Sequence, residues 1–244
     1  MITDLTKWDA VKQSLCPTLM VPQKSELPEC KSGQTRFLMA ADGLYLETRT
    51  EWGGLVRKLW DCPRLIPLPY GKVEEKDDFI VVLHDKVMPI VSGVMIPEAA
   101  KYAEQGKEWA GFVVWNGSDF VPWTEEFNAT ASAVDFLSQG AANLPEGLSL
   151  VADIHSHWKG SPFFSKDDNA SDNGRIKIAV VLGNYRVKDN KPVFDWKARY
   201  CVEGFFFSGA TAEDSLIEKF RDLLLRNLGE EVSRAKEDFP FREV

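Results

Sequence analysis

The chain has 244 residues, of which 44% are hydrophobic and 27% are charged, a balance typical of a globular protein rather than a disordered one. Its 37 acidic and 29 basic residues give a formal net charge of −8, which argues against non-specific binding to nucleic acid. The longest apolar runs, such as residues 79–83 and 178–182, are too short to cross a bilayer, and the first residues show no signal-peptide pattern. We therefore expect a cytoplasmic protein without a membrane partner.

The cysteines give no indication of a zinc finger or a redox motif. Cys16, Cys30, Cys62 and Cys201 form no C-x-x-C pair and fit no zinc-finger spacing. In a chain of this size and expected location, we predict that they are reduced and at least partly buried.

Residues 1–75 are rich in proline and only weakly periodic, so we treat them as a separate N-terminal region of unknown role. Asp42-Gly43 lies between two β-prone runs and predicts a β-hairpin. Residues 51–60 carry apolar side chains at spacings compatible with a helix or a strand, and both types stay open. Residues 71–78 are polar and charged, as is typical of a linker or an exposed loop.

Residues 76–244 alternate between strand and helix patterns, which predicts an α/β domain built on a mixed β-sheet flanked by helices. A helix is predicted at residues 97–106, with Pro97 in its first turn. A C-terminal helix carries an apolar stripe that we expect to pack on the core, with partner binding as the alternative. In chain order, the predicted elements are strands at 79–84, 87–95 and 109–115, a helix at 130–140, strands at 148–155, 176–182 and 192–202, and the C-terminal helix at 211–234.

Two of the three histidines, His155 and His157, stand two residues apart at the end of a predicted strand. Side chains at i and i+2 of a strand point to the same face, so two imidazoles can bind one ion. Catalytic zinc takes three protein ligands and leaves one position for water, whose pKa it lowers toward neutrality. Asp168 follows a loop containing glycine and proline and can complete the set, while Asp167 and Asp172 lie close enough to compete.

Hydrolysis at such a site also needs a group that takes a proton from water and passes it to the leaving amine. Glu108, at the start of the strand predicted at 109–115, is the best candidate, and Glu98 and Glu104 are nearby alternatives. Ser165 is a candidate donor to the oxyanion that forms on the attacked carbonyl.

Together these residues resemble the JAMM (MPN-plus) metallopeptidases. The pattern is His155-Ser-His157, seven residues, then Ser165-x-x-Asp168, with Glu108-x-x-Gly upstream, and the likeness covers roughly residues 80–205. It implies a zinc-dependent peptidase or isopeptidase with one zinc ion per chain. In this family the histidines and the aspartate bind the metal, the glutamate is the general acid and base, and the serine supports the tetrahedral intermediate.

Two positions depart from the family pattern, because Trp158 and Phe164 stand where members usually carry proline. Both lie in the loop expected to shape the substrate cleft, so they bear on the substrate more than on the metal. We place Trp158 at the substrate groove. His84 is interpreted as structural, and Asp153 as a partly exposed strand residue, with a contact behind the metal ligands as the alternative.

A weakly patterned region before a JAMM core, at about this length, is also similar to a component of the bacterial PRTRC gene cassette. That cassette contains a ThiF-like adenylating protein and a small ubiquitin-like protein, so the likeness implies a substrate with a ubiquitin-like C-terminal tail and a ThiF-like partner. Two other functions stay open: an MPN-like binding or scaffold module without catalysis, and a zinc amidase acting on a small molecule. A β-lactamase-like zinc hydrolase is disfavoured because Lys159 stands where its signature requires aspartate.

Overall fold

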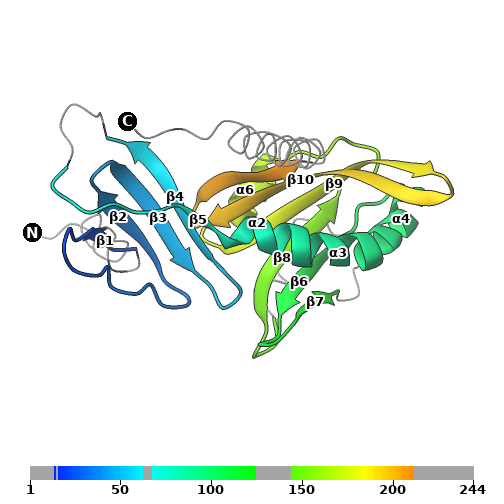
Figure 1. The fold of residues 1–244 in the computed structure, drawn as a ribbon. Coiled ribbons are helices and arrows are strands. Elements are labelled where there is room, and N and C mark those ends of the chain that lie inside the picture. Colours follow the sequence, from blue (N-terminus) through cyan, green and yellow to red (C-terminus); the bar gives the residue numbers. More distant parts are fainter. Residues whose placement is uncertain (1–13, 15, 63–67, 125–143, 212–244) are drawn as a thin grey trace, which may run out of the picture.

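The protein is built on two β-sheets that both contribute residues to one hydrophobic cluster. The structure is a computed structural model, and it describes residues 14, 16–62, 68–124 and 144–211. One sheet has five strands in the order β1-β2-β3-β4-β5, and the other has six in the order β11-β10-β9-β8-β6-β7. The two sheets lie side by side (Figure 1). Both sheets are mixed, because β1 and β2 pair in parallel, as do β8 and β9. The mixed α/β class predicted from the sequence is confirmed at this level.

The five-stranded sheet is formed by the N-terminal region. Its predicted hairpin is confirmed, since Ala40 pairs with Gly43 across a two-residue turn. Gly43 has a φ of 153°, and a side chain there would collide with the Trp60 carbonyl, so only glycine fits. The segment whose type was left open is largely a strand. The strands are β1 (Thr18–Met20), β2 (Thr35–Ala40), β3 (Gly43–Arg49), β4 (Gly54–Asp61) and β5 (Lys76–Asp77).

One continuous helix, Asp78–Glu104, replaces the two strands predicted at 79–84 and 87–95. Those predictions were wrong because β-branched runs were taken for strands, whereas the buried residues recur every fourth position. Asp77 starts the helix by accepting a hydrogen bond from the Ile80 N–H at 3.0 Å. Seven side chains in one stripe are at most 3% exposed: Phe79, Leu83, Val87, Val91, Met95, Ala99 and Ala103.

Two π-helical turns keep that stripe on one side of the helix. The helix consists of α2 (Asp78–Val82), η1 (Leu83–Val87), α3 (Met88–Ile90), η2 (Val91–Met95) and α4 (Ile96–Glu104). In a regular α-helix, each residue four positions further along lies about 40° further around the helix axis, so a stripe with this repeat would wind around the helix. The wider π turns, where Met88 and Ile96 donate to carbonyls five residues earlier, offset this drift. Pro89 and Pro97 follow those two donors, so each proline lies inside the helix and not at its start.

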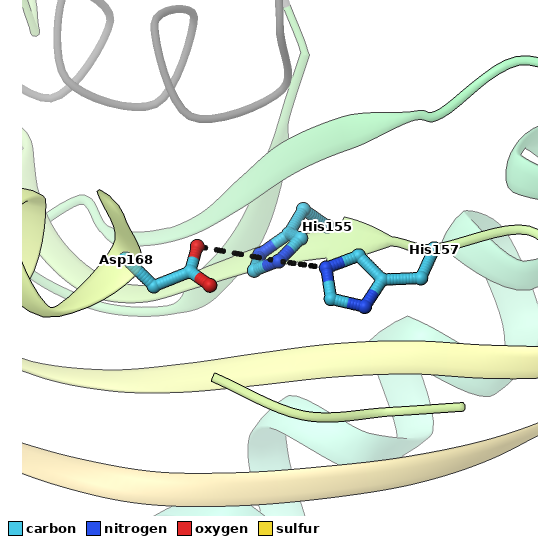
Figure 2. Close-up of side chains that lie close together, drawn as sticks. All are labelled: His155, His157 and Asp168. Atoms are coloured by element: carbon cyan, nitrogen blue, oxygen red, sulfur yellow. Dashed lines mark hydrogen bonds and ion pairs between the residues drawn. The ribbon is translucent and has the colours of Figure 1, made fainter. Parts of the chain in front are cut away.

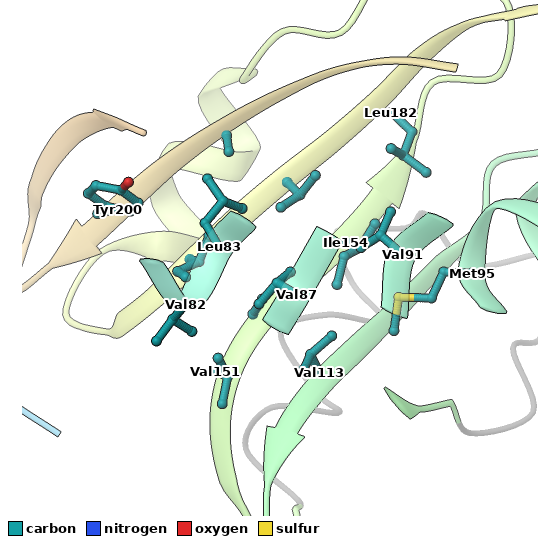
Figure 3. Close-up of a cluster of buried hydrophobic side chains, with 14 of the residues drawn as sticks. Val82, Leu83, Val87, Val91, Met95, Val113, Val151, Ile154, Leu182 and Tyr200 are labelled. Carbon is teal, nitrogen blue, oxygen red and sulfur yellow. The ribbon is translucent and has the colours of Figure 1, made fainter. Parts of the chain in front are cut away.

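By length and apolar composition alone, this helix could cross a membrane, unlike the short apolar runs considered from the sequence. Its buried stripe, however, packs on the six-stranded sheet (Figure 3). In the most apolar 18-residue window of the helix, 33% is buried inside the protein. Absence of a membrane partner stays a prediction.

The six-stranded sheet follows the predicted strands, with additions. Strands predicted at 109–115, 148–155, 176–182 and 192–202 are confirmed, the third being longer than expected. Two edge strands, β7 and β11, were not predicted. The strands are β6 (Ala110–Trp115), β7 (Phe120–Trp123), β8 (Ser149–Ser156), β9 (Ile176–Lys188), β10 (Lys191–Val202) and β11 (Phe205–Thr211). The helix predicted at 130–140 and, apart from Thr211, the one predicted at 211–234 lie outside the described residues.

The two faces of this sheet have different roles. Ile154, Ile178 and Tyr200 belong to the core cluster under the long helix. Strand alternation turns their neighbours, including His155 and Lys177, to the opposite face. The short helix α6 (Lys166–Asp172) covers part of that opposite face, since its Asp172 contacts Lys177. The polar side chains therefore lie on the face of the sheet opposite the main apolar core.

Candidate metal centre

The end of β8 places the two histidines. His155 is paired with Ala110 of β6 and with Val181 of β9, so its backbone is fixed from both sides. His157 lies just beyond the strand, and its N–H donates to the Leu182 carbonyl at 2.8 Å, which continues the pairing with β9. The i, i+2 spacing therefore delivers both imidazoles to one face, as the sequence predicts.

The third side chain, Asp168, comes from α6, a helix that the sequence analysis did not predict. Ser165 is its N-cap: the serine hydroxyl accepts from the Asp168 N–H at 3.1 Å, and Asp168 Oδ2 accepts from the Ser165 N–H at 2.6 Å. This reciprocal capping box leaves Asp168 Oδ1 directed at the histidines. The Ser-x-x-Asp pattern was a visible helix-start signal that was interpreted only as a catalytic motif.

Two of the three separations between the ligand atoms match those of a tetrahedral zinc site. The Nε2 atoms of His155 and His157 are 3.2 Å apart, and His155 Nε2 is 3.4 Å from Asp168 Oδ1 (Figure 2). All three lie within 4.8 Å of one another. Zinc–ligand bonds of about 2.0–2.1 Å in a tetrahedron put ligand atoms roughly 3.3 Å apart. The donor set and its geometry therefore fit a zinc ion.

Burial favours the neutral form of His155, and a hydrogen bond orients the ring of His157. His155 is 3% exposed, and this burial lowers its pKa to about 4 although Asp168 opposes the change. His157 Nδ1 lies 3.2 Å from the Ser161 carbonyl, a pure acceptor, so the ring proton belongs on Nδ1. That tautomer leaves the Nε2 lone pair free to face the other ligand atoms.

The loop after His157 is held against β9. Gly160 O accepts from the Asn184 N–H at 2.7 Å, and Trp158 O accepts from the Tyr185 N–H at 2.8 Å. Gly183 lies so close to the loop that an added Cβ would be under 3.0 Å from backbone atoms of Gly160 and Ser161. The loop that carries the second ligand is thereby fixed by backbone contacts.

Two aromatic residues of this loop, Trp158 and Phe163, lie in different surroundings. Trp158 has a φ of 43°, and its ring lies beside Gly106, packed on the main core cluster. Its predicted place in a substrate groove stays a prediction. Phe163, half exposed, packs on His157 with 4.7 Å between ring centroids and 56° between ring planes, so it lies next to a candidate ligand.

The structure favours Glu108 among the three candidate bases. Ala110 pairs with His155, and Ser156 donates to Trp109 O at 2.9 Å, so the antiparallel register puts exposed Glu108 across from His157. Glu98 instead pairs with Lys101 at 2.6 Å, and Glu104 accepts from the Tyr185 hydroxyl at 3.2 Å. Glu108 as the base remains a prediction.

Ser165 has a structural task besides its predicted one. Its hydroxyl oxygen accepts from Asp168 N–H, yet a hydroxyl also has one proton to donate. Capping α6 and donating to an oxyanion are therefore compatible, and the second role stays a prediction.

Asp153, interpreted as partly exposed, is in fact 2% exposed and lies in a buried ion-pair network. It contacts Lys177, which also pairs with Asp172 at 2.5 Å. Neither of the two other aspartates considered as ligands belongs to the grouped site: Asp167 is exposed, and Asp172 is further bound by Arg199 at 2.5 Å. Lys177 and Arg199, which interrupt apolar strands, were the sequence signal for this network.

The other residues noted in the sequence have structural surroundings. His84, on the long helix, packs edge-on to Trp196 at 6.3 Å between ring centroids. The four cysteines are free, and burial raises the pKa of Cys16, Cys30 and Cys201, which disfavours their thiolates.

Comparison with known families agrees with this geometry. Residues 96–199 match the family of prokaryotic homologs of the JAB domain, a segment that contains all five proposed site residues. Residues 6–79, which include strands β1 to β5, match a domain of unknown function (DUF2016). No curated protein is significantly similar to the chain. The match supports the JAMM/MPN family for residues 96–199, in line with the resemblance seen in the sequence.

Proposed function

We propose that the chain is a zinc-dependent JAMM-type peptidase or isopeptidase that hydrolyses an amide bond. The observation that carries the proposal is the convergence of one ligand atom each from His155, His157 and Asp168 within 4.8 Å of one another. The match of residues 96–199 to the JAB family supports it, because that family includes metalloisopeptidases.

In the proposed mechanism, His155, His157 and Asp168 hold one zinc ion, which supplies Lewis acidity toward the carbonyl and makes water more acidic. Glu108 accepts a proton from the attacking water and returns it to the leaving amine as the C–N bond breaks. The Ser165 hydroxyl donates a hydrogen bond to the oxygen that gains negative charge. Glu108 is exposed, which suits a base that must exchange protons with substrate and solvent.

For the substrate we propose the C-terminal tail of a ubiquitin-like protein, with a ThiF-like adenylating protein as a partner in a PRTRC-type system. The likeness of domain order to that system supports this choice. An extended tail can add main-chain hydrogen bonds to a sheet edge, which gives affinity without a deep pocket.

Two measurements test the proposal. Elemental analysis should find about one zinc per wild-type chain, because three protein ligands bind one zinc ion and leave its fourth position for water. The His155→Ala/His157→Ala variant should lose the metal. Cleavage of a fluorogenic ubiquitin-like tail amide should then depend on zinc. A wild-type chain that takes up no zinc when it is supplied would contradict the enzyme and favour an MPN-like scaffold.

The small-molecule amidase is separated from the peptidase by comparing substrates on one zinc-loaded preparation. A tail fusion that is cut while small amides are not would support the peptidase. The reverse result would assign the same ligands to a small-molecule hydrolase.

A further inference from the structure

The buried network beside the metal centre is organised around Arg199 of β10. Its guanidinium binds Asp172 through Nε at 3.1 Å and Nη2 at 2.5 Å, and donates from Nη1 to Asn169 Oδ1 at 2.6 Å. Both acceptors belong to α6, the helix that carries Asp168. Arginine can make this forked set of contacts because its donors are planar and fixed in direction.

The same guanidinium also holds the segment just before α6. Its central carbon lies 3.9 Å from the centroid of the Phe164 ring and 4.2 Å from that of Phe206. Phe164 immediately precedes the N-cap Ser165, at a position where the resembling family usually has proline. Arg199 thus contacts the chain on both sides of Asp168.

The helix geometry connects these contacts to the metal ligand. Asp168 and Asp172 are four residues apart, so they lie on one face of α6, and they are 4% exposed each. Asp168 faces the histidines while Asp172 is bound by Arg199 and Lys177. Movement of Asp172 would therefore tilt the turn that carries Asp168.

The network reaches the histidine strand as well. Lys177 of β9 bridges Asp172 of α6 to Asp153 of β8, which is two residues before His155 on the same strand face. Burial opposes ionisation of Asp172, yet Lys177 and Arg199 hold the pKa of its carboxyl below the usual range, so it keeps its charge. One lysine consequently ties the two elements that supply His155 and Asp168.

We propose that Arg199, Asp172, Lys177 and Asp153, with Phe164 and Asn169, form a positioning clamp that sets the Asp168 carboxylate relative to His155 and His157. Within the described residues, no hydrogen bond or ion pair joins the clamp to a ligand atom. The clamp controls metal affinity and coordination geometry through the placement of α6. This inference rests on the proposed function only in requiring that the three side chains bind a metal.

The test uses the full chain, Zn²⁺ and Co²⁺, and four variants. Asp172→Asn removes the charge at the centre of the clamp, Arg199→Lys keeps the charge but loses the fork, and Asn169→Ala removes one hydrogen bond at an exposed position. Asp167→Asn is the matched control, because it makes the same charge change on the exposed side of α6. Folding is checked on the metal-free chains by circular dichroism and thermal melting, and zinc affinity by competition with a chelating dye.

We expect Asp172→Asn and Arg199→Lys to bind Zn²⁺ about 10–100-fold more weakly than wild type, as is usual when groups behind metal ligands are changed. Asn169→Ala should show a smaller loss, and Asp167→Asn should match wild type. The visible spectrum of bound Co²⁺ should change in the first two variants, which reports a displaced ligand and not merely a less stable fold.

Folded variants with wild-type zinc affinity and an unchanged Co²⁺ spectrum would overturn the clamp while leaving the metal site intact. An equal loss in Asp167→Asn would also overturn it, because the effect would then be one of overall charge. If Asp172→Asn fails to fold, Asn169→Ala and Arg199→Lys decide by the same criteria. A wild-type chain that binds neither ion would overturn the proposed function itself, and the clamp with it.

Discussion

At the scale of single residues, the candidate metal centre depends on side chains and backbone groups that each meet a specific requirement. His157 Nδ1 faces the Ser161 carbonyl, which assigns its tautomer, and Asp168 uses one oxygen for the helix cap and the other for the site. The ligands were predictable from the sequence because their types and spacing are specific. The clamp was not, since Asp172 and Arg199 are 27 positions apart and only the fold brings them together.

The assignment of Glu108 is tested by replacing it with glutamine. Glu108→Gln should bind zinc like wild type, because Glu108 is not among the three grouped ligands, and should lose at least about 100-fold in kcat, since proton transfer is worth 10²–10⁴-fold. Glu98→Gln is the control and should keep full turnover. Full turnover in Glu108→Gln would remove this residue from the mechanism.

Gly183 is predicted to be essential for the loop that carries His157. Gly183→Ala forces the backbone at Gly160 and Ser161 away from β9, which should lower the free energy of unfolding by about 1–3 kcal/mol and weaken zinc binding. Gly93→Ala is the control: no atom lies within 4 Å of its added Cβ, so its stability should be unchanged or raised by up to about 1 kcal/mol. Urea unfolding and dye competition measure both effects. Wild-type behaviour of Gly183→Ala would contradict the close approach.

At the scale of elements, the long helix is where sequence interpretation failed. Its valine- and isoleucine-rich runs favour strands by local preference, and two prolines argue against a continuous helix. The π turns make both features compatible with a helix, because they accommodate the prolines and keep the stripe in phase. The strands of the six-stranded sheet were predicted more accurately, because strands buried on both faces have continuous apolar sequences that are easy to recognise.

Val81 and Leu83 distinguish the helix from the strand by mutation. In a strand they would share a face, whereas in the helix Leu83 is 0% exposed and Val81 is 54% exposed. Leu83→Ala should lower the free energy of unfolding by about 2–5 kcal/mol. Val81→Ala should change it by no more than about 0.5 kcal/mol. Similar losses at both positions, measured by chemical denaturation, would argue for the strand.

At the scale of the whole molecule, the N-terminal sheet and the JAB-like part are joined through the core. Leu46, Trp52 and Leu55 of the N-terminal region belong to the same buried cluster as the six-stranded sheet. The Trp52 indole N–H donates to Leu150 O at 3.1 Å, and its ring lies 4.5 Å from that of Phe79. The sequence could not reveal this junction, because contacts between distant segments leave no local pattern.

Unfolding should therefore be cooperative across both sheets. Trp52→Ala should lower the free energy of unfolding by about 3–5 kcal/mol, and zinc release and far-ultraviolet circular dichroism should report one common transition. The half-exposed Trp60 offers the control, and Trp60→Ala should have little effect. Two separate transitions, with zinc retained after the first, would show that the sheets fold independently.

The order of elements along the chain has a consequence for synthesis. The long helix ends at Glu104, yet the strands that cover its apolar stripe extend to Val202, about a hundred residues later. At the usual pace of roughly 5–20 residues per second, the ribosome needs about 5–20 s to supply that cover. Among the described residues made before this interval, Trp52 of the N-terminal region packs on Phe79. We expect ribosome-associated chaperones to bind the emerging chain. The N-terminal sheet would give the helix its first packing contacts within the chain.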